Sequence, residues 1–132
     1  MAKPTYLLDT GILIRHLRGR RDVIQLVRGL GRKKRTAVSA ITHLELYVGA
    51  HPEEDYGTRK LLSRFQTIPV DANIARRAGE LVRRQQSQGR ALSIPDAIIA
   101  ATTLQYGLTL ATFNPKYFGL PGLQLYPLNI QP

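Results

Sequence analysis

The sequence predicts one α/β domain in which a small parallel sheet lies between layers of helices. Short apolar runs typical of buried strands alternate along the chain with longer segments whose apolar residues recur at helical spacing. This alternation implies parallel strands covered by helices on both faces. The length of 132 residues fits one domain, and no repeat, low-complexity tract or linker divides it. We therefore interpret residues 1–132 as a single domain.

The chain is expected to begin with a strand and two helices. The run 5–8 is short and apolar, which indicates a buried strand, and a helix then reaches His16. Apolar residues recur at helical spacing over 22–30, so a second helix is expected there. Because glycine commonly ends helices, we expect this helix to stop near Gly29 and Gly31.

The next expected pair is a strand over 36–38 and a helix that Ser39 caps and that runs to about residue 50. Apolar residues on one side of a helix normally face the core. The expected buried side of this helix therefore carries Ile41, Leu44 and Val48.

The rest of the chain continues the alternation. Asp71 and Ser93 are expected helix caps, and Asp96 stands at the third position of its helix, as in a capping box. The helix over 96–106 is apolar nearly all round, which is typical of a buried helix. The remaining expected elements are a polar turn over 51–56, helices over 56–65 and 72–88, and strands over 68–70, 109–111 and 123–126.

The charge predicts a polyanionic partner. Nineteen Lys and Arg against nine Asp and Glu give a net charge of +10, which favours binding to nucleic acid or to an acidic protein. The densest basic run is either a solvated loop or an RNA contact, and it consists of Arg32, Lys33, Lys34 and Arg35.

The composition also excludes several classes of protein. With no cysteine, the chain has no thiolate zinc site and no cysteine nucleophile, and it fits a reducing compartment. No stretch approaches the roughly 20 apolar residues that a membrane span needs. The first residues do not have the pattern of a signal peptide. These features predict a soluble protein of the cytoplasm.

Three carboxylates stand in apolar sequence: Asp9 in LLDTGILI, Glu45 in ITHLELYVG and Asp96 in IPDAIIAA. A buried carboxylate needs a partner, and the sequence offers few cations beside these three. Asp9 follows the first strand, where open α/β sheets place their sites. A shared hard cation, Mg²⁺ or Mn²⁺, would satisfy all three. The alternatives are that Asp9 and Asp96 cap helices and that Glu45 extends to solvent.

The stretch YLLDTG also admits a different chemistry. Apolar residues before Asp-Thr-Gly occur in aspartic proteases, in which two such aspartates share a proton. Those proteases are almost wholly β, whereas this chain is expected to turn helical after Gly11. A protease dimer built on Asp9 is therefore the weaker alternative.

Three blocks of the sequence resemble PIN-domain ribonucleases, specifically VapC-type toxins of toxin–antitoxin pairs: YLLDTGILI, AVSAITHLELYVGA and GRALSIPDAIIAATTLQYGLTLATFNPKYF. Their order and separation agree with that family over almost the whole chain. The resemblance implies a PIN-like three-layer sandwich, a Mg²⁺-dependent endoribonuclease, and Asp9, Glu45 and Asp96 as its catalytic, metal-binding acids. It gives Thr10 a supporting role beside the first acid. It also implies a cognate antitoxin that blocks the groove, and a homodimer.

The last block departs from the family's pattern. The family closes its site with a fourth acidic or amide position in Thr-x-Asn-x-x-Asp-Phe, whereas Tyr117 stands here where the acid is common. No acid follows Asp96. Either Asn114, with Thr112 beside it, completes the site, or three carboxylates suffice for metal-assisted hydrolysis of RNA. The remaining alternative is a non-catalytic PIN domain that binds RNA or an antitoxin.

Overall fold

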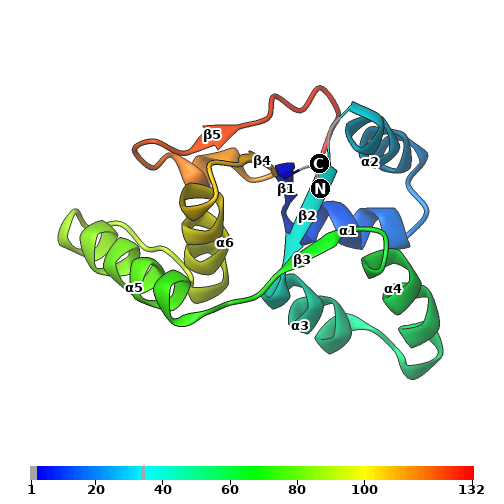
Figure 1. The fold of residues 1–132 in the computed structure, drawn as a ribbon, viewed down its shortest axis with the longest axis horizontal. Helices are drawn as coiled ribbons and strands as arrows, with labels where there is room; N and C mark the ends of the chain where they lie inside the picture. The colour runs from blue at the N-terminus through cyan, green and yellow to red at the C-terminus, as the bar shows by residue number, and fades with distance from the viewer. Residues whose placement is uncertain (1–2, 34) are drawn as a thin grey trace.

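The computed structural model describes residues 3–33 and 35–132, and its centre is a five-stranded parallel sheet. The strands lie in the order β3-β2-β1-β4-β5, so the first strand is central (Figure 1). Because every neighbouring pair is parallel, all strands end at the same edge of the sheet. The strands are β1 (Pro4–Leu8), β2 (Arg35–Ser39), β3 (Gln66–Ile68), β4 (Thr109–Ala111) and β5 (Gln124–Leu125).

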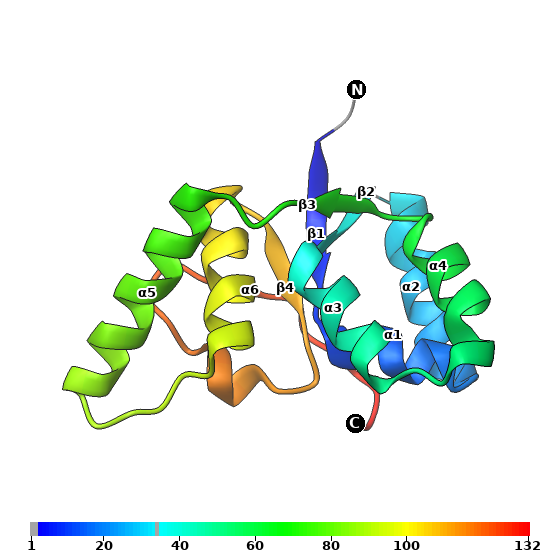
Figure 2. The same cartoon turned by 90° about the horizontal axis from the view of Figure 1, so that it is seen from below.

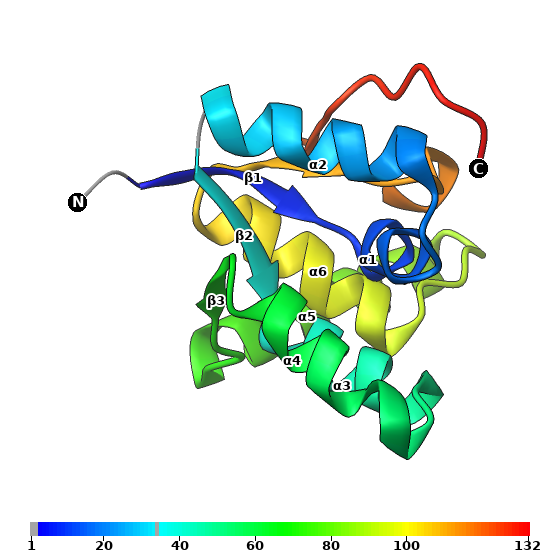
Figure 3. The same cartoon turned by 90° about the vertical axis from the view of Figure 1, so that its right-hand side faces the viewer.

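Helices cover both faces of this sheet and complete three layers. Two of them, α5 and α6, lie on one side, and α1, α2 and α4 lie on the other (Figure 2). Figure 3 faces the second side, with α2 above β1 and β2 and α4 below them. The helices are α1 (Thr10–Leu17), α2 (Arg21–Lys33), α3 (Ala40–Gly49), α4 (Asp55–Leu62), α5 (Ala72–Ser87) and α6 (Ile94–Gln105), with short 3₁₀ helices η1 (Pro52–Glu54) and η2 (Pro115–Phe118).

The central strands supply a separate core to each side of the sheet. Successive side chains of a strand point to opposite faces. One residue of each strand therefore packs against α5 and α6 and the next against the α1, α2 and α4 side, in the pairs Leu7 and Leu8, Ala37 and Val38, and Leu110 and Ala111. This confirms the predicted α/β sandwich. In the described part of the chain, none of the helices has the length and apolar character that crossing a membrane requires.

Helix α2 continues through Gly29 and Gly31 to Lys33, so the prediction that it ends near those glycines is wrong. A glycine inside a helix costs roughly 1 kcal/mol relative to alanine. A buried apolar stripe offsets that cost here, and it consists of Val23, Val27 and Leu30.

The basic run is consequently not one loop. Arg32 lies on the last turn of α2, and Arg35 is the first residue of β2. Lys34 and the side chain of Lys33 lie outside the described residues. Since Arg35 begins its strand, this run belongs to the amino edge of the sheet.

Helix α3 buries a different side from the one predicted. Leu44 and Val48 are 57% and 78% exposed, whereas Thr42 and Leu46 are buried. The residues Ile41, Leu44 and Val48 do not form one buried face, because Ile41 alone packs against the core beside α6. The apolar residues of this helix surround its axis, so spacing alone does not decide which of them the neighbouring helix α1 covers.

Two strands differ from their expected bounds. The third strand was expected over 68–70, but β3 covers Gln66–Ile68. Pro69 has no N–H to donate to a neighbouring strand, which explains why pairing stops at Ile68. The last strand is shorter than 123–126 and pairs only through Gln124–Leu125.

Candidate active site at the carboxyl edge of the sheet

Asp9 lies at the carboxyl edge, in the middle of the sheet. It directly follows β1, it is the N-cap of α1, and its N–H donates to the carbonyl of Ala111 at the end of β4 (3.0 Å). Its side chain is only 6% exposed. Oδ1 accepts the N–H of Thr10 (2.9 Å), and Oδ2 accepts the hydroxyl of Thr112 (2.6 Å). Asp9 therefore caps a helix, and both of its carboxylate oxygens are held in place.

The loop after β4 orients the hydroxyl that binds Asp9. The Oγ1 atom of Thr112 accepts the backbone N–H of Asn114 (3.0 Å) while donating its own hydrogen to Asp9. These two hydrogen bonds hold the Thr112 hydroxyl in a single orientation. Thr112 is buried, so the bond to Asp9 is shielded from water.

Glu45 joins the site through Thr10. The Thr10 hydroxyl donates to Oε1 of Glu45 (2.7 Å), and it also lies 2.9 Å from the hydroxyl of Thr42. Since the single hydrogen of Thr10 goes to Glu45, Thr42 must supply the hydrogen between the two threonines. The residue next to Asp9 in sequence thus fixes a carboxylate that α3 carries, in the second turn of that helix.

Asp96 enters from α6. It lies in the first turn of that helix, is half-buried, and its N–H donates to Oγ of the capping residue Ser93 (3.2 Å). Among the described residues, its carboxylate takes part in no hydrogen bond, so the return bond of a full capping box is not formed. The expected cap is confirmed, and the carboxylate is left available for another partner.

The three acids share one electrostatic environment. Burial raises the pKa of Asp9, and the negative charges of Asp96 and Glu45 raise it further, against the bonds from Thr112 and Thr10 that lower it. Within residues 3–33 and 35–132, the one ion pair joins Arg20 and Asp22, away from this site. The buried acid therefore has carboxylate neighbours and no cationic partner.

The carboxylate oxygens and the negative charge at this edge of the sheet fit a divalent cation. Three carboxylates provide the hard oxygen ligands that Mg²⁺ and Mn²⁺ prefer. In the described part of the chain, no three Asp, Glu, His or Cys side chains already surround a single point closely enough to hold a metal. Repulsion among three negative groups opposes such a closed arrangement. The fold brings the acids onto neighbouring elements without closing them into a ligand set.

A positively charged side chain also borders the site. Arg15 Nη1 donates to the carbonyl of Gly11 (2.8 Å), and its guanidinium lies 4.4 Å from the centre of the Phe113 ring. Gly11 follows Thr10, and Phe113 follows Thr112, so both contacts tie Arg15 to the segments that hold Asp9. Arg15 was not among the site residues predicted from the sequence. Its only local signal is the spacing of four from Gly11, one helical turn.

A groove of about 390 Å³ extends from Glu45 between α1, α3, η1 and α4. Its lining includes Arg18, the residue that follows α1, and the acidic pair Glu53 and Glu54. The carboxyl edge of the sheet is therefore rich in negative charge, and a phosphate backbone bound there needs cations to offset it.

Several other predicted site residues lie outside this constellation. The Asn114 side chain is exposed, and in the described structure it makes no hydrogen bond; only its backbone N–H contacts Thr112. Tyr117 is 52% exposed, with the Lys116 ammonium near its ring. Arg32 and Arg35 lie at the opposite edge of the sheet.

Comparisons with known proteins agree with this architecture. A family model described as "PIN domain" matches residues 6–121. Ribonuclease VapC10 of Mycobacterium tuberculosis is 36% identical over 115 residues, which are 85% of this chain and 84% of that protein.

Two solved structures contain similar chains. One is a toxin–antitoxin complex from Klebsiella pneumoniae, with a TM-score of 0.75 and 36% identity over 90% of this chain and 95% of that one. The other is VapBC2 from Rickettsia felis bound to a DNA fragment from its promoter, with a TM-score of 0.82 and 26% identity over 92% of this chain and 97% of that one.

Proposed function

This chain belongs to the PIN-domain family, and from that premise we propose that it is an endoribonuclease and the toxin of a toxin–antitoxin pair. One observation carries the proposal. Asp9, Glu45 and Asp96 come from neighbouring elements, and the buried Asp9 has no cationic partner in the part of the chain that is described. Relatives named ribonuclease VapC support it. An aspartic protease does not fit a parallel α/β sheet.

The proposed cofactor is Mg²⁺ or Mn²⁺, held by Asp9, Glu45 and Asp96. When bound, such a cation activates water for attack on phosphorus and stabilises charge on the leaving oxygen. The carboxylates of the three acids differ in the hydrogen bonds that hold them. Asp9 presents oxygens fixed by backbone and hydroxyl donors, Glu45 is held by Thr10, and Asp96 keeps a carboxylate without competing hydrogen bonds.

Residues around the acids act as positioning residues in this proposal. Thr112 fixes Asp9, and the backbone of Asn114 fixes Thr112. We assign metal binding to three carboxylates and give the Asn114 side chain no required role as a ligand. Arg15 is held by Gly11 and Phe113, on the segments that flank Asp9 and Thr112, where its remaining N–H groups can bind a phosphate of the RNA.

The proposal is tested by incubating the purified chain with a total RNA pool and mapping the new ends by sequencing. New ends are expected with Mg²⁺ or Mn²⁺ and none with excess chelator. Because the proposed substrate is RNA, we also propose a cytoplasmic location. RNA binding without metal-dependent cleavage would instead favour a non-catalytic PIN domain.

Replacing Thr112 with valine is expected to move the acidic limb of the pH–rate profile to higher pH. The Thr112 hydroxyl lowers the pKa of Asp9, whereas burial and the two neighbouring acids raise it. Without this bond the pKa of Asp9 rises further, so a higher pH is needed to form the carboxylate. Rates of RNA cleavage measured from about pH 5 to 8 at one Mg²⁺ concentration below saturation, where protonation of Asp9 competes with metal binding, give the two profiles.

Thr103→Val is the matched control for this experiment. Thr103 is also buried, and its hydroxyl donates to the carbonyl of Ile99 within α6 (2.8 Å). This control should reduce stability by a similar amount and leave the acidic limb in its wild-type position. If the limb of Thr112→Val coincides with that of wild type, the bond to Asp9 does not govern the reactive protonation state.

The proposed protein partner is an antitoxin, as in the toxin–antitoxin complex from Klebsiella pneumoniae that contains a similar chain. Purification of the tagged chain from its native cells, followed by identification of any small protein bound to it, tests this, and failure to co-purify one counts against it. We also propose a homodimer through the exposed apolar side of α3, which carries Leu44, Tyr47 and Val48. A monomer in analytical ultracentrifugation would contradict that part.

A further inference from the structure

A second basic region lies between α2 and the end of α4, away from the carboxylates. Here a hollow of about 210 Å³ is lined by His16 from α1, Arg28 from α2 and Arg64 after α4. Thr36 of β2 and Phe65 also contribute to its wall. Its volume exceeds that of several water molecules at about 30 Å³ each, so it has room for a phosphate group.

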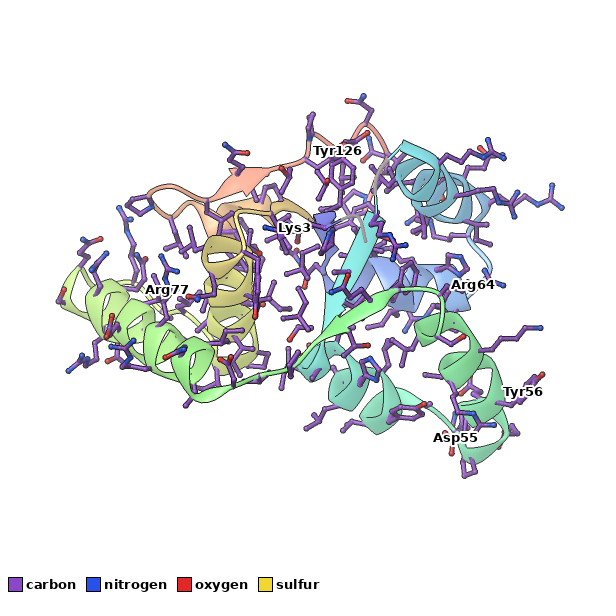
Figure 4. The ribbon with its side chains drawn as sticks, in the orientation of Figure 1. Lys3, Asp55, Tyr56, Arg64, Arg77 and Tyr126 are labelled. Carbon is purple, nitrogen blue, oxygen red and sulfur yellow. The ribbon has the colours of Figure 1, made fainter. Side chains whose placement is uncertain are left out.

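The hollow continues toward the amino edge of the sheet. A larger hollow of about 570 Å³ shares Arg64 and Phe65 with the first, and it adds Lys3 before β1 and Arg35 at the start of β2. Figure 4 labels Lys3 and Arg64, which both line this second hollow. We call the two hollows together the α2–α4 groove.

Only positive charge lines the α2–α4 groove. Its four Lys and Arg side chains come from four separate segments of the chain, and no Asp or Glu is among the residues lining either hollow. Apart from the pair of Arg20 with Asp22, the described residues contain no ion pair, so the arginines of the groove are not neutralised by carboxylates. This concentration of cations costs electrostatic energy that a bound anion would relieve.

The charges of the arginines affect the pKa of His16, which lines the groove. Burial lowers the pKa of His16, and the charges of Arg64 and Arg28 lower it further. The histidine is half-buried, and it lines the hollow together with Arg64, which follows α4, and Arg28 of α2. The negative charge of a phosphate bound between these groups would raise the pKa of the imidazole, against the effect of the two arginines.

We propose that the α2–α4 groove binds the phosphate backbone of the RNA substrate at a distance from the cleaved bond. The inference rests on the proposed ribonuclease function. The groove at the active site is lined by Glu45, Glu53 and Glu54 against one arginine, Arg18, so its net charge is negative and opposes a polyanion. The groove reaches the other edge of the sheet, about 16 Å away for a strand of five residues at roughly 3.3 Å each. RNA bound at both places is held over several nucleotides.

The test compares Arg28→Gln/Arg64→Gln with wild type in binding of a fluorescent 20-nucleotide oligo(U), in chelator, at several salt concentrations. Each lost phosphate contact should reduce the slope of log affinity against log salt by about 0.7 for a single strand, hence by about 1.4 for both. The matched control, Arg76→Gln/Arg83→Gln, removes the same charge from exposed positions of α5. An equal change of slope in both double variants would overturn the inference.

Two further readouts separate this inference from the proposed function. In Mg²⁺-dependent cleavage of long RNA, the groove variant should raise KM and leave kcat unchanged, whereas an unchanged KM would count against the groove. In NMR titrations of metal-free protein, oligo(U) should raise the pKa of His16 and leave that of His43, which lies outside the groove beside Thr67, unchanged. If wild type binds and cleaves RNA but both groove readouts match the control, only the inference fails.

Discussion

Replacing Asp9 with asparagine is expected to abolish RNA cleavage and to raise the melting temperature of the metal-free protein. Cleavage should fall at least about 100-fold, since loss of an outer-shell partner alone typically costs roughly 10- to 100-fold. Stability should rise because the buried carboxylate is penalised by burial and by the charges of Asp96 and Glu45. Asparagine keeps an oxygen for the N–H of Thr10 and can donate to Thr112.

The rise in melting temperature that Asp9→Asn causes should depend on pH. The pKa of Asp9 is raised in the folded protein, so folding favours the neutral acid. The penalty is absent below the pKa of an unfolded aspartate, about 4, and it develops as the pH rises through the folded pKa. The melting temperatures of Asp9→Asn and wild type should therefore coincide near pH 3 and diverge toward pH 7, as measured by circular dichroism in chelator.

Asp71→Asn is the control for replacing a helix-capping aspartate with asparagine. Asp71 is exposed and caps α5 by accepting the N–H of Ile74 (2.9 Å). Asparagine caps helices about as well as aspartate, so cleavage and melting temperature should both stay at wild-type values. Full cleavage by Asp9→Asn, or a melting temperature below wild type at pH 7, would contradict the account of Asp9.

Replacing Asp96 with asparagine should lower cleavage by at least about 100-fold without a comparable change in stability. Its carboxylate is half-buried and, among the described residues, receives no hydrogen bond, so the change disrupts no packing or bonding. The one expected cost is the loss of a negative charge at a helix start, about 0.3–1 kcal/mol. Cleavage of a defined RNA and thermal unfolding measure the two effects.

Asp55→Asn is the control for Asp96→Asn, because it removes a negative charge from the start of another helix. Asp55 is an exposed carboxylate in the first turn of α4. Its loss should cost about as much favourable interaction with the helix start as Asp96→Asn, without the relief of repulsion on Asp9, while leaving cleavage intact. If Asp96→Asn cleaves at the wild-type rate, Asp96 is a helix-start residue and the assignment of the three acids is wrong.

The sequence allowed the elements that carry the acids to be located, because their signals are local. The caps Ser39, Asp71 and Ser93 each bond to their helix as predicted, and Asp9 follows its strand. The prediction of which side of α3 is buried was wrong for a physical reason. A helix with apolar residues all round has no single face that spacing can identify, and contact with α1 decided in favour of Leu46.

The bonds that organise the site were beyond sequence reasoning because they join distant parts of the chain. Thr10 and Glu45 are separated by 35 positions, and Asp9 and Thr112 by 103. A single sequence gives no signal for a particular side-chain pair at such separations. The same holds for Arg15, whose contact with Phe113 depends on β1 and β4 being neighbours in the sheet.

Calorimetric titration of Mn²⁺ into the purified protein at neutral pH tests most directly whether Asp9, Glu45 and Asp96 together hold a divalent cation. Wild type is expected to bind Mn²⁺ saturably with release of protons, because a carboxyl whose pKa is raised must ionise to bind metal. Asp9→Asn and Asp96→Asn should each bind at least tenfold more weakly, with Asp71→Asn unchanged. Binding of Mn²⁺ by both site variants as tightly as by wild type would contradict the assignment of the three acids.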